Sequence, residues 1–586
     1  MTEMSPRRAL EHPPYLHKLS FSFHMLPLLL GLPGCGDPAP STPADGGAAD
    51  ARDVPEEPRT YAGPAAVVVT RYGLALDVAT RQARATLALR VRAAGDCVEL
   101  ASRVEDVTEV TLDGAPARDV THGEGRLRAC DPASRGYAVD REVSLGVAYT
   151  VPQGTWRGTQ IGFSTRNDAA GRPFTYALGW VEQCDRLVPC DPSPGTFATY
   201  DLDLTHAMDQ RAWCAGQVTA EPGRTRCTFR HEGGPTYSTL GALVGRSWTA
   251  RTLGTREGVT VVLHDNPAVD VARQLNTDAV LGFLAWMSRT FGPYPYGDEL
   301  RIVVAPTFWA GFEHPGNIAL GEGTVRGRLD HTVLHEIAHQ WAGDQTTLAS
   351  ARDFVWKEAM AEYLAYVWED ENLPAQAQAT RQVWKDVAFN ARTYPVPEER
   401  LTLLEYYGSA YGPGPMIFFR QLESLSERPR VLAALRELLG RPRALSVEDV
   451  QRALERATGL PLEGYFRAWL RGPGAPSWPT ARIARSATPE GATRVTVTLS
   501  NRDGRTRGCR FRVRLRGAGM EMYDIPMDFG TDGATERSAT AMVPFEVTRE
   551  ELDPLQECLV YPASEGASRL AKPVSQPWLA DGWSGP

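Results

Sequence analysis

The chain has little lysine and no excess of positive charge. Only four of its 62 lysine and arginine residues are lysine, and acidic residues outnumber basic ones, giving a net charge of −9 and a pI of about 5.8. A domain that binds nucleic acid normally carries a basic patch and a high pI, so we expect no nucleic-acid partner. We attribute the scarcity of lysine beside abundant arginine, alanine, glycine and proline to a GC-rich genome rather than to function.

The chain also lacks an apolar run long enough to span a membrane as a helix. Residues 19–32 are mostly apolar, but a spanning helix needs about 20 such residues, so the run better suits the apolar part of a signal peptide. Residues 32–35, Leu-Pro-Gly-Cys, resemble a bacterial lipobox that ends in a lipidated cysteine. A cleaved soluble signal peptide and a misplaced start are the alternatives. We expect residues 1–35 to direct export of a bacterial lipoprotein, anchored to the periplasmic or cell-surface membrane through Cys35.

Cysteines in CxxC spacing are absent, which favours disulfides over a cysteine metal site. Apart from Cys35 the chain has eight cysteines, an even number that suits an exported protein. Proximity in sequence favours four pairs: Cys97 with Cys130, Cys184 with Cys190, Cys214 with Cys227, and Cys509 with Cys558. We interpret the second pair as structural, because a nucleophilic cysteine would need a base and an exported chain rarely keeps a free thiol.

The distribution of apolar residues predicts a tether and three folded regions in this 586-residue chain, without internal repeats. Residues 36–65 have almost no large apolar side chains and predict a flexible tether. Alternating apolar residues predict an N-terminal β domain over residues 66–265. A helix expected over residues 271–291 opens a mixed helical and strand region at 266–478. Strand patterns return over residues 479–586.

The most informative motif lies between residues 331 and 363, in the sequence HTVLHEIAHQWAGDQTTLASARDFVWKEAMAEY. On a helix His335 and His339 share one face, so both imidazoles can reach one metal ion. Glu358, on a second helical stretch, can supply a third ligand and leave the fourth position of a catalytic zinc open for water. Glu336 lies beside the metal, where a general base must sit. Because nitrogen and oxygen donors with an open position suit zinc better than magnesium or calcium, we expect one Zn²⁺ per chain.

A surface helix with two solvated histidines is the alternative interpretation of this motif. Apolar residues surround it, however, and a charged glutamate on a buried helix needs a functional reason. These apolar neighbours are Val333, Leu334, Ile337, Ala338, Trp341, Val355, Trp356, Met360, Ala361 and Leu364. Glu362 shares a helix face with Glu358, and it either hydrogen-bonds a ligand histidine or lies in water at the surface.

The spacing of two histidines and a glutamate eighteen residues later, with Gln-Trp after the second histidine, resembles the M1 family of zinc aminopeptidases (gluzincins). Residues 310–316, Ala-Gly-Phe-Glu-His-Pro-Gly, resemble the family's GxMEN exopeptidase loop, and residues 411–414 resemble its catalytic tyrosine segment. Weaker matches at residues 187–191 and 457–476 follow the family's order. The resemblance implies a multidomain α+β fold with an N-terminal β domain, a thermolysin-like α/β zinc catalytic domain and a C-terminal β-sandwich.

The resemblance also implies roles for residues around the metal. Glu313 would bind the free α-amine of the substrate through a charge-assisted hydrogen bond, and Gly311 would let the backbone approach the substrate. Tyr411 would donate its phenol to the oxyanion that forms when water attacks the carbonyl. Glu182 would be a second amine ligand from the β domain. A glutamate in an ordinary turn is the alternative for Glu313. For Tyr411 the alternatives are a tyrosine in the core and the nearby Tyr406 or Tyr407 in its place.

The chain departs from the family pattern at a few positions. Phe312 and His314 stand where the exopeptidase loop has methionine and asparagine, and Ala359 stands where glycine usually follows the third ligand. These changes bear on substrate preference, since they remove neither a metal ligand nor the base.

We therefore expect a zinc metallopeptidase that hydrolyses the N-terminal peptide bond of peptides with a free N-terminus. An endopeptidase or another hydrolase on the same scaffold is one alternative, because such an enzyme would not need Glu313 to bind an amine. A catalytically inactive, surface-anchored binding protein is the other. The intact set of ligands, base and tyrosine argues against it, since an inactive protein is free to lose them.

Overall fold

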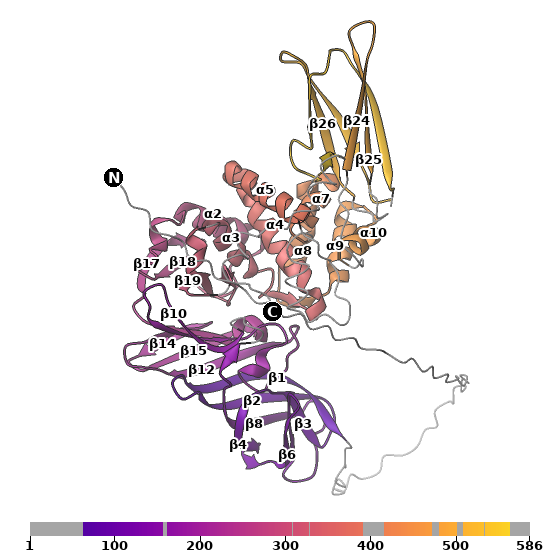
Figure 1. Cartoon of the computed structure of the whole chain (residues 1–586). Helices are drawn as coiled ribbons and strands as arrows, with labels where there is room; N and C mark the ends of the chain where they lie inside the picture. Colours follow the sequence, from indigo (N-terminus) through magenta and orange to yellow (C-terminus); the bar gives the residue numbers. More distant parts are fainter. Residues whose placement is uncertain are drawn as a thin grey trace, which may run out of the picture. The chain divides into compact units, whose positions relative to one another are not determined.

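The computed structural model describes residues 63–155, 161–307, 309–326, 328–390, 415–470, 480–500, 508–532, 534–558 and 560–562 (Figure 1). The expected signal segment with Cys35, most of the expected tether, and Tyr411 lie outside these residues. Within the described part of the chain, no helix is both long enough and apolar enough to cross a membrane.

The first described region, which we call the N-terminal β region, consists almost entirely of strands. Its larger sheet contains β1 (Pro64–Asp77), β2 (Gln82–Ala93), β3 (Cys97–Ala101), β4 (Glu105–Leu112), β5 (Ala115–Pro116), β6 (Arg118–Gly123), β7 (Arg126–Cys130), β8 (Glu142–Thr150), β12 (Phe197–Thr205), β14 (Gln217–Glu221) and β15 (Arg224–Pro235). Its smaller sheet runs in the order β10 (Gly162–Asn167), β11 (Pro173–Leu178), β16 (Gly241–Gly245) and β13 (Arg211–Trp213). Short elements are β9 (Gly154–Thr155), the 3-10 turn Cys184–Arg186 and α1 (Thr236–Thr239).

Alternation of apolar residues explains why these segments are strands. In β2 every second residue from Ala83 to Val91 is buried, while the residues between them are exposed or half-buried. Successive side chains of a strand point to opposite faces, so one face of β2 joins the core. The expected β-rich N-terminal region is confirmed.

A five-stranded sheet follows, in the order β17 (Thr249–Arg256), β18 (Val259–Asp265), β19 (Glu299–Ala305), β21 (Asn317–Gly321) and β20 (Gly311–Phe312). Strand β19 pairs in parallel with β18 and β21, and β20 pairs antiparallel with β21. The turn between β20 and β21 therefore carries Glu313 at the edge of the sheet.

The helix expected over residues 271–291 is shorter than predicted. Residues Val271–Arg273 form a 3-10 turn, and the helix α2 covers only Thr277–Phe291. Asn276 explains the late start, because its side chain accepts a hydrogen bond from the Ala279 backbone and caps the helix.

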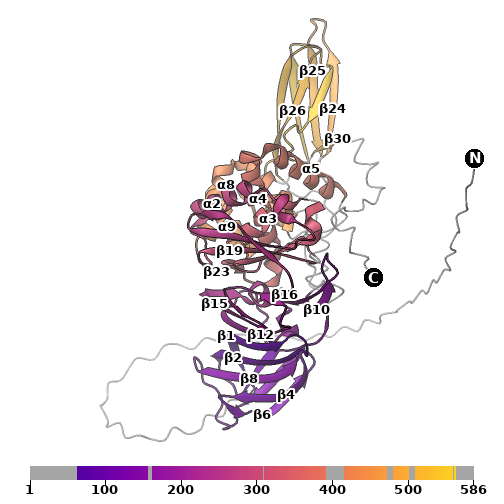
Figure 2. The same cartoon turned by 90° about the vertical axis from the view of Figure 1, so that its left-hand side faces the viewer.

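Helices α3 (Leu329–His339) and α4 (Phe354–Asn372) lie side by side next to α2 and carry the metal motif (Figures 1 and 2). They are joined through β22 (Thr346–Leu348) and a 3-10 turn at Ala351–Asp353, and another 3-10 turn at Glu322–Arg326 precedes α3. The remaining elements of this region are α5 (Pro374–Asn390), α7 (Pro415–Ser426), α8 (Arg428–Leu439), β23 (Arg443–Leu445), α9 (Val447–Thr458) and α10 (Glu463–Leu470). One hydrophobic core is continuous from the N-terminal β region to α10.

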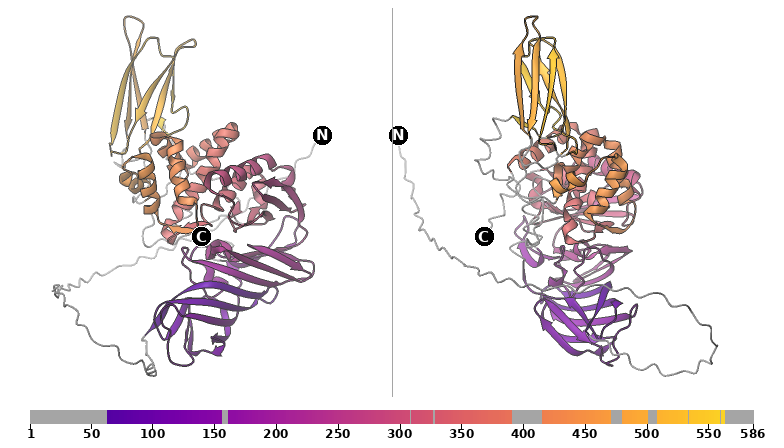
Figure 3. Two further views of the ribbon diagram at one scale, coloured as in Figure 1. Left: turned by 180° about the vertical axis from the view of Figure 1, so that it is seen from behind. Right: turned by 90° about the vertical axis from the view of Figure 1, so that its right-hand side faces the viewer.

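The last described strands form two small sheets with a core of their own. One sheet has the order β28 (Glu536–Val543), β25 (Thr493–Ser500), β24 (Thr480–Ala487) and β30 (Tyr561–Pro562); the other has β27 (Met522–Asp528), β26 (Arg510–Arg516) and β29 (Arg549–Leu552). These strands are orange to yellow in Figure 3. Apolar residues of both sheets form one buried cluster that includes the cystine Cys509–Cys558.

All four cysteine pairs favoured by sequence proximity are present, so the disulfide prediction is confirmed. The expected domain boundaries stay predictions.

Candidate active site

Helix α3 places the two histidines of the motif against each other. His335 and His339 lie one turn apart, and their Nε2 atoms are 2.9 Å from each other. Both side chains are buried, as are the apolar residues Val333, Leu334 and Ile337 on the same helix. The alternative of a surface helix with solvated histidines is therefore wrong.

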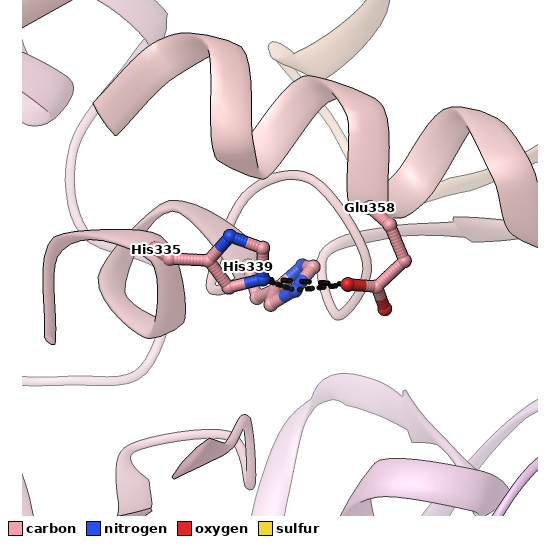
Figure 4. A group of neighbouring side chains, drawn as sticks. All are labelled: His335, His339 and Glu358. Carbon is pink, nitrogen blue, oxygen red and sulfur yellow. Dashed lines mark hydrogen bonds and ion pairs between the residues drawn. The ribbon is translucent and has the colours of Figure 1, made fainter. Parts of the chain in front are cut away.

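Helix α4 brings a carboxylate to the same point (Figure 4). The Oε2 atom of Glu358 lies 3.3 Å from Nε2 of His335 and 3.4 Å from Nε2 of His339. The three donor atoms therefore converge although Glu358 belongs to a different helix. This is the ligand set that the sequence spacing predicts.

Neighbouring acceptors fix the tautomers of both histidines. Nδ1 of His335 is 3.1 Å from Oε2 of Glu362, and Nδ1 of His339 is 2.9 Å from the backbone oxygen of Ala342. A carboxylate and a carbonyl only accept hydrogen bonds, so in the neutral imidazoles each Nδ1 carries the proton and each Nε2 can direct its lone pair at the common point. Glu362 is buried and accepts a hydrogen bond from His335, so the alternative of a glutamate in water at the surface is wrong.

The buried point where these three donor atoms converge is suited to a positive charge. Burial disfavours a charged imidazole, but Glu358 and Glu362, which accept hydrogen bonds from His335, raise the pKa of His335 to about 10. The electrostatic environment therefore favours a cation between the three ligands. Two imidazole nitrogens and one carboxylate oxygen fit zinc, and they are too few to enclose it, as a catalytic zinc site requires.

Glu336 lies beside these ligands rather than among them. Its carboxylate is buried, and its Oε2 atom has no hydrogen-bond partner within the described residues. Burial, together with the charges of Glu313 and Glu358, raises the pKa of Glu336 to about 8. Gly311 of β20 lies directly against it, and any Cβ at that position would overlap the carboxylate. The absence of a side chain at Gly311 thus lets the edge strand approach the proposed base.

Lys357 is the residue of this site that sequence analysis missed. Its Nζ atom lies 2.7 Å from Oε1 of Glu313 and 2.6 Å from Oε1 of Glu358, and its side chain is buried. Through its ammonium group, Lys357 joins the turn that carries Glu313 to Glu358 on helix α4. A lysine among the apolar residues of α4, in a chain with only four lysines, was the available clue.

The turn that carries Glu313 is fixed by contacts from two sides. Nδ1 of His314 lies 2.5 Å from the backbone oxygen of Ser238 and donates to it, and Oε1 of Gln340 accepts from the backbone nitrogen of Gly316 at 2.8 Å. His314, which departs from the family pattern, therefore ties the loop to the N-terminal β region.

The structure does not bring Glu182 into polar contact with the described residues of this cluster. Glu182 is exposed and joins none of the polar contacts between the candidate residues in the described chain. Its segment does lie close to the site, since the ring of Trp180 is 5.7 Å from that of Phe354, the first residue of α4. Tyr411 lies outside the described residues, so its expected role stays a prediction.

Comparisons with known proteins agree with this geometry. Residues 278–400 match the family model described as the Peptidase family M1 domain. The chain is similar to leukotriene A-4 hydrolase of Xenopus laevis (24% identical over 334 residues, 53% of this chain and 52% of that protein). It is also similar to leucine aminopeptidase 2 of Chaetomium globosum (24% identical over 278 residues, 45% of this chain and 44% of that protein).

Similarity to a solved structure concerns the fold. The crystal structure of Legionella pneumophila aminopeptidase A in complex with aspartic acid superposes with a TM-score of 0.67 at 13% identity, covering 84% of this chain and 58% of that one. The present chain spans about half the length of the curated relatives that it matches. The resemblance to the M1 family that the motifs predict is therefore confirmed, by the match of residues 278–400 to the Peptidase family M1 domain and by the similarity to these relatives.

Proposed function

We propose that this peptidase is a zinc-dependent aminopeptidase, which hydrolyses the N-terminal peptide bond of peptides. The proposal rests on the convergence of His335, His339 and Glu358 at one buried point. Zinc bound there would supply Lewis-acid activation of a water molecule and of the scissile carbonyl.

Glu336 is the proposed general base. It lies close to the ligands, because its carboxylate and the donor atoms of Glu313 and His339 are all within 4.8 Å of one another. Its unpartnered oxygen can accept a proton from the attacking water and later deliver it to the leaving amine. Tyr411 remains the proposed donor to the oxyanion, supported by the sequence motif.

Glu313 is proposed to select the end of the peptide. Lys357 contacts its Oε1 at 2.7 Å, which leaves its Oε2 for another donor. An α-ammonium group can bind this second oxygen through a charge-assisted hydrogen bond. Because the anchor lies beside the metal ligands, the bond that reaches the metal would be the one after the first residue.

A peptide library presented in free and N-acetylated forms tests this proposal. We expect the zinc-loaded chain to remove residues stepwise from free peptides, as seen by mass spectrometry, and Glu336→Gln to show no such products. Internal cleavage of both forms would instead identify an endopeptidase. Absence of cleavage by the zinc-loaded chain would favour the binding-protein alternative.

We also propose that the enzyme is exported and anchored through a lipid on Cys35. The lipobox-like sequence supports this, and four disulfides within the described chain suit an oxidising compartment. Mass spectrometry of the mature protein should find a diacylglyceryl group on Cys35. A mature chain that retains an unmodified Cys35 would contradict the anchor.

A further inference from the structure

Two overlapping groups of side chains in this site could each hold a metal ion. One consists of His335, His339 and Glu358, and the other of Glu313, Glu336 and His339. In each group the donor atoms lie within 4.8 Å of one another, and every member is buried. Because both groups contain His339, one ion between the histidines could also recruit Glu313. If Glu358 and not Glu313 is to bind the ion, another group must hold Glu313 away from it.

Lys357 lies between the two carboxylates that belong to different groups. Its ammonium contacts Oε1 of Glu313 at 2.7 Å and Oε1 of Glu358 at 2.6 Å. Oε2 of Glu358 is the atom that faces both histidines. Each glutamate thus has one oxygen engaged by Lys357, and the other oxygen of Glu358 lies within 3.4 Å of both imidazoles.

The position of Lys357 is set by tight packing around its hydrocarbon chain. A Cβ added to Gly343 would lie only 3.0 Å from Cε of Lys357, so the backbone there approaches the side chain as closely as a glycine allows. The ammonium also lies 5.3 Å from the ring centre of Phe354 and 6.0 Å from that of Tyr237. These contacts leave the lysine little freedom to move away.

We propose that Lys357 is a positioning residue that divides two adjacent carboxylates between two tasks. It keeps Glu313 out of metal coordination, so that this residue remains available to the substrate amine, and it leaves Glu358 a single oxygen for the metal. This inference rests on the proposed function, because it presupposes the zinc site.

The physical basis is competition between cations for the same oxygens. A carboxylate paired at 2.7 Å with a buried ammonium gains little from turning to a metal ion, since it would leave the ammonium unpaired. The ammonium also repels a dication in this poorly solvated place. Without the lysine, Glu313 and the second oxygen of Glu358 would both be free to become ligands. They would then occupy the zinc coordination position that a catalytic site keeps open for water.

The direct test uses Co²⁺ and Zn²⁺ as probes of Lys357→Met. Cobalt with four ligands absorbs visible light more strongly than cobalt with five or six. We expect the absorption of the Co²⁺ form of Lys357→Met to fall about twofold or more relative to the unmutated chain. We also expect Zn²⁺ affinity, measured by competition with a chromophoric chelator, to rise about tenfold, because a repelling charge is lost and ligands are gained.

Two further variants separate the parts of the proposal. Glu313→Gln alone should leave the cobalt spectrum unchanged, because Glu313 is not a ligand when Lys357 is present. In the double variant Lys357→Met/Glu313→Gln, recovery of the spectrum, complete or partial, assigns the recovered part to Glu313. If Lys357→Met does not fold, Lys357→Gln should show the same changes at smaller size, since its amide still donates hydrogen bonds but lacks the charge.

Three outcomes would overturn the inference. One is a Lys357 variant with an unchanged cobalt spectrum and Zn²⁺ affinity, as expected if the lysine only stabilises the fold. Another is a double variant whose spectrum does not recover at all. The third is a changed spectrum in Glu313→Gln alone. These results differ from failure of the proposed function, in which the unmutated chain would bind no zinc at all; that result would overturn both.

Discussion

The proposed metal ligands and the proposed amine-binding residue of this site are positioned in different ways. His335, His339 and Glu358 come from two neighbouring helices within one short stretch of chain. Glu313 comes from the turn of an edge strand, and its conformation depends on Lys357 from α4 and on the N-terminal β region through His314. The first group is thus specified by local spacing, and the second only by the packing of distant segments.

Loss of a ligand should have the largest effect. His339→Ala removes one of the two nitrogen donors, so we expect zinc to be lost on dialysis and peptidase activity to fall about 10⁴-fold. Zinc content and initial rates measure this. The exposed histidine variant His122→Ala is the matched control and should keep both. Full activity in His339→Ala would mean that the metal group is not the reaction centre.

Replacement of Glu336, the proposed base, should abolish turnover but leave the three proposed metal ligands in place. We expect Glu336→Gln to bind zinc as the unmutated chain does and to lose about 10²–10⁴-fold in kcat, since the amide cannot accept the proton. Metal analysis beside steady-state kinetics tests this. Turnover within a few-fold of the unmutated chain would assign the proton transfer to another residue.

Glu362 tests whether the hydrogen bond that His335 donates from Nδ1 contributes to zinc binding. Its carboxylate orients His335 and also accepts a hydrogen bond from Nε1 of Trp384 at 2.7 Å. Burial raises the pKa of Glu362, but His331 and His335 outweigh this effect and hold the pKa well below its usual range. We expect Glu362→Gln to weaken zinc binding about 10–100-fold. Glu463→Gln, on an exposed position of α10, should not change it. Equal zinc affinity in both variants would make the contact dispensable.

The pH dependence of kcat/KM should be the effect most specific to Glu336. Burial raises the pKa of this carboxyl to about 8, and a bound dication would lower it from there. Only the ionised form accepts a proton, so kcat/KM should rise with pH up to a midpoint below about 8, about tenfold per pH unit. A kcat/KM that stays constant from about pH 5 to about pH 8 would exclude Glu336 as a base that titrates in this range.

The contrast between the two halves of the site also explains what could be predicted. The spacing of His335, Glu336 and His339 fixes their relative positions once a helix forms, and the apolar neighbours of Glu358 indicate its helix. The start of α2 at Thr277 was missed because a single capping residue, Asn276, outweighs the apolar pattern before it. Lys357 could not be assigned from sequence, because its partner Glu313 lies 44 positions away on another element.

Diffraction from zinc-loaded crystals, recorded on both sides of the zinc absorption edge, tests the ligand assignment most directly. We predict one anomalous peak per chain, bounded by Nε2 of His335, Nε2 of His339 and one oxygen of Glu358, with Glu313 still paired to Lys357. A peak elsewhere in the chain, or Glu313 coordinated to the metal at this site, would contradict the proposed arrangement.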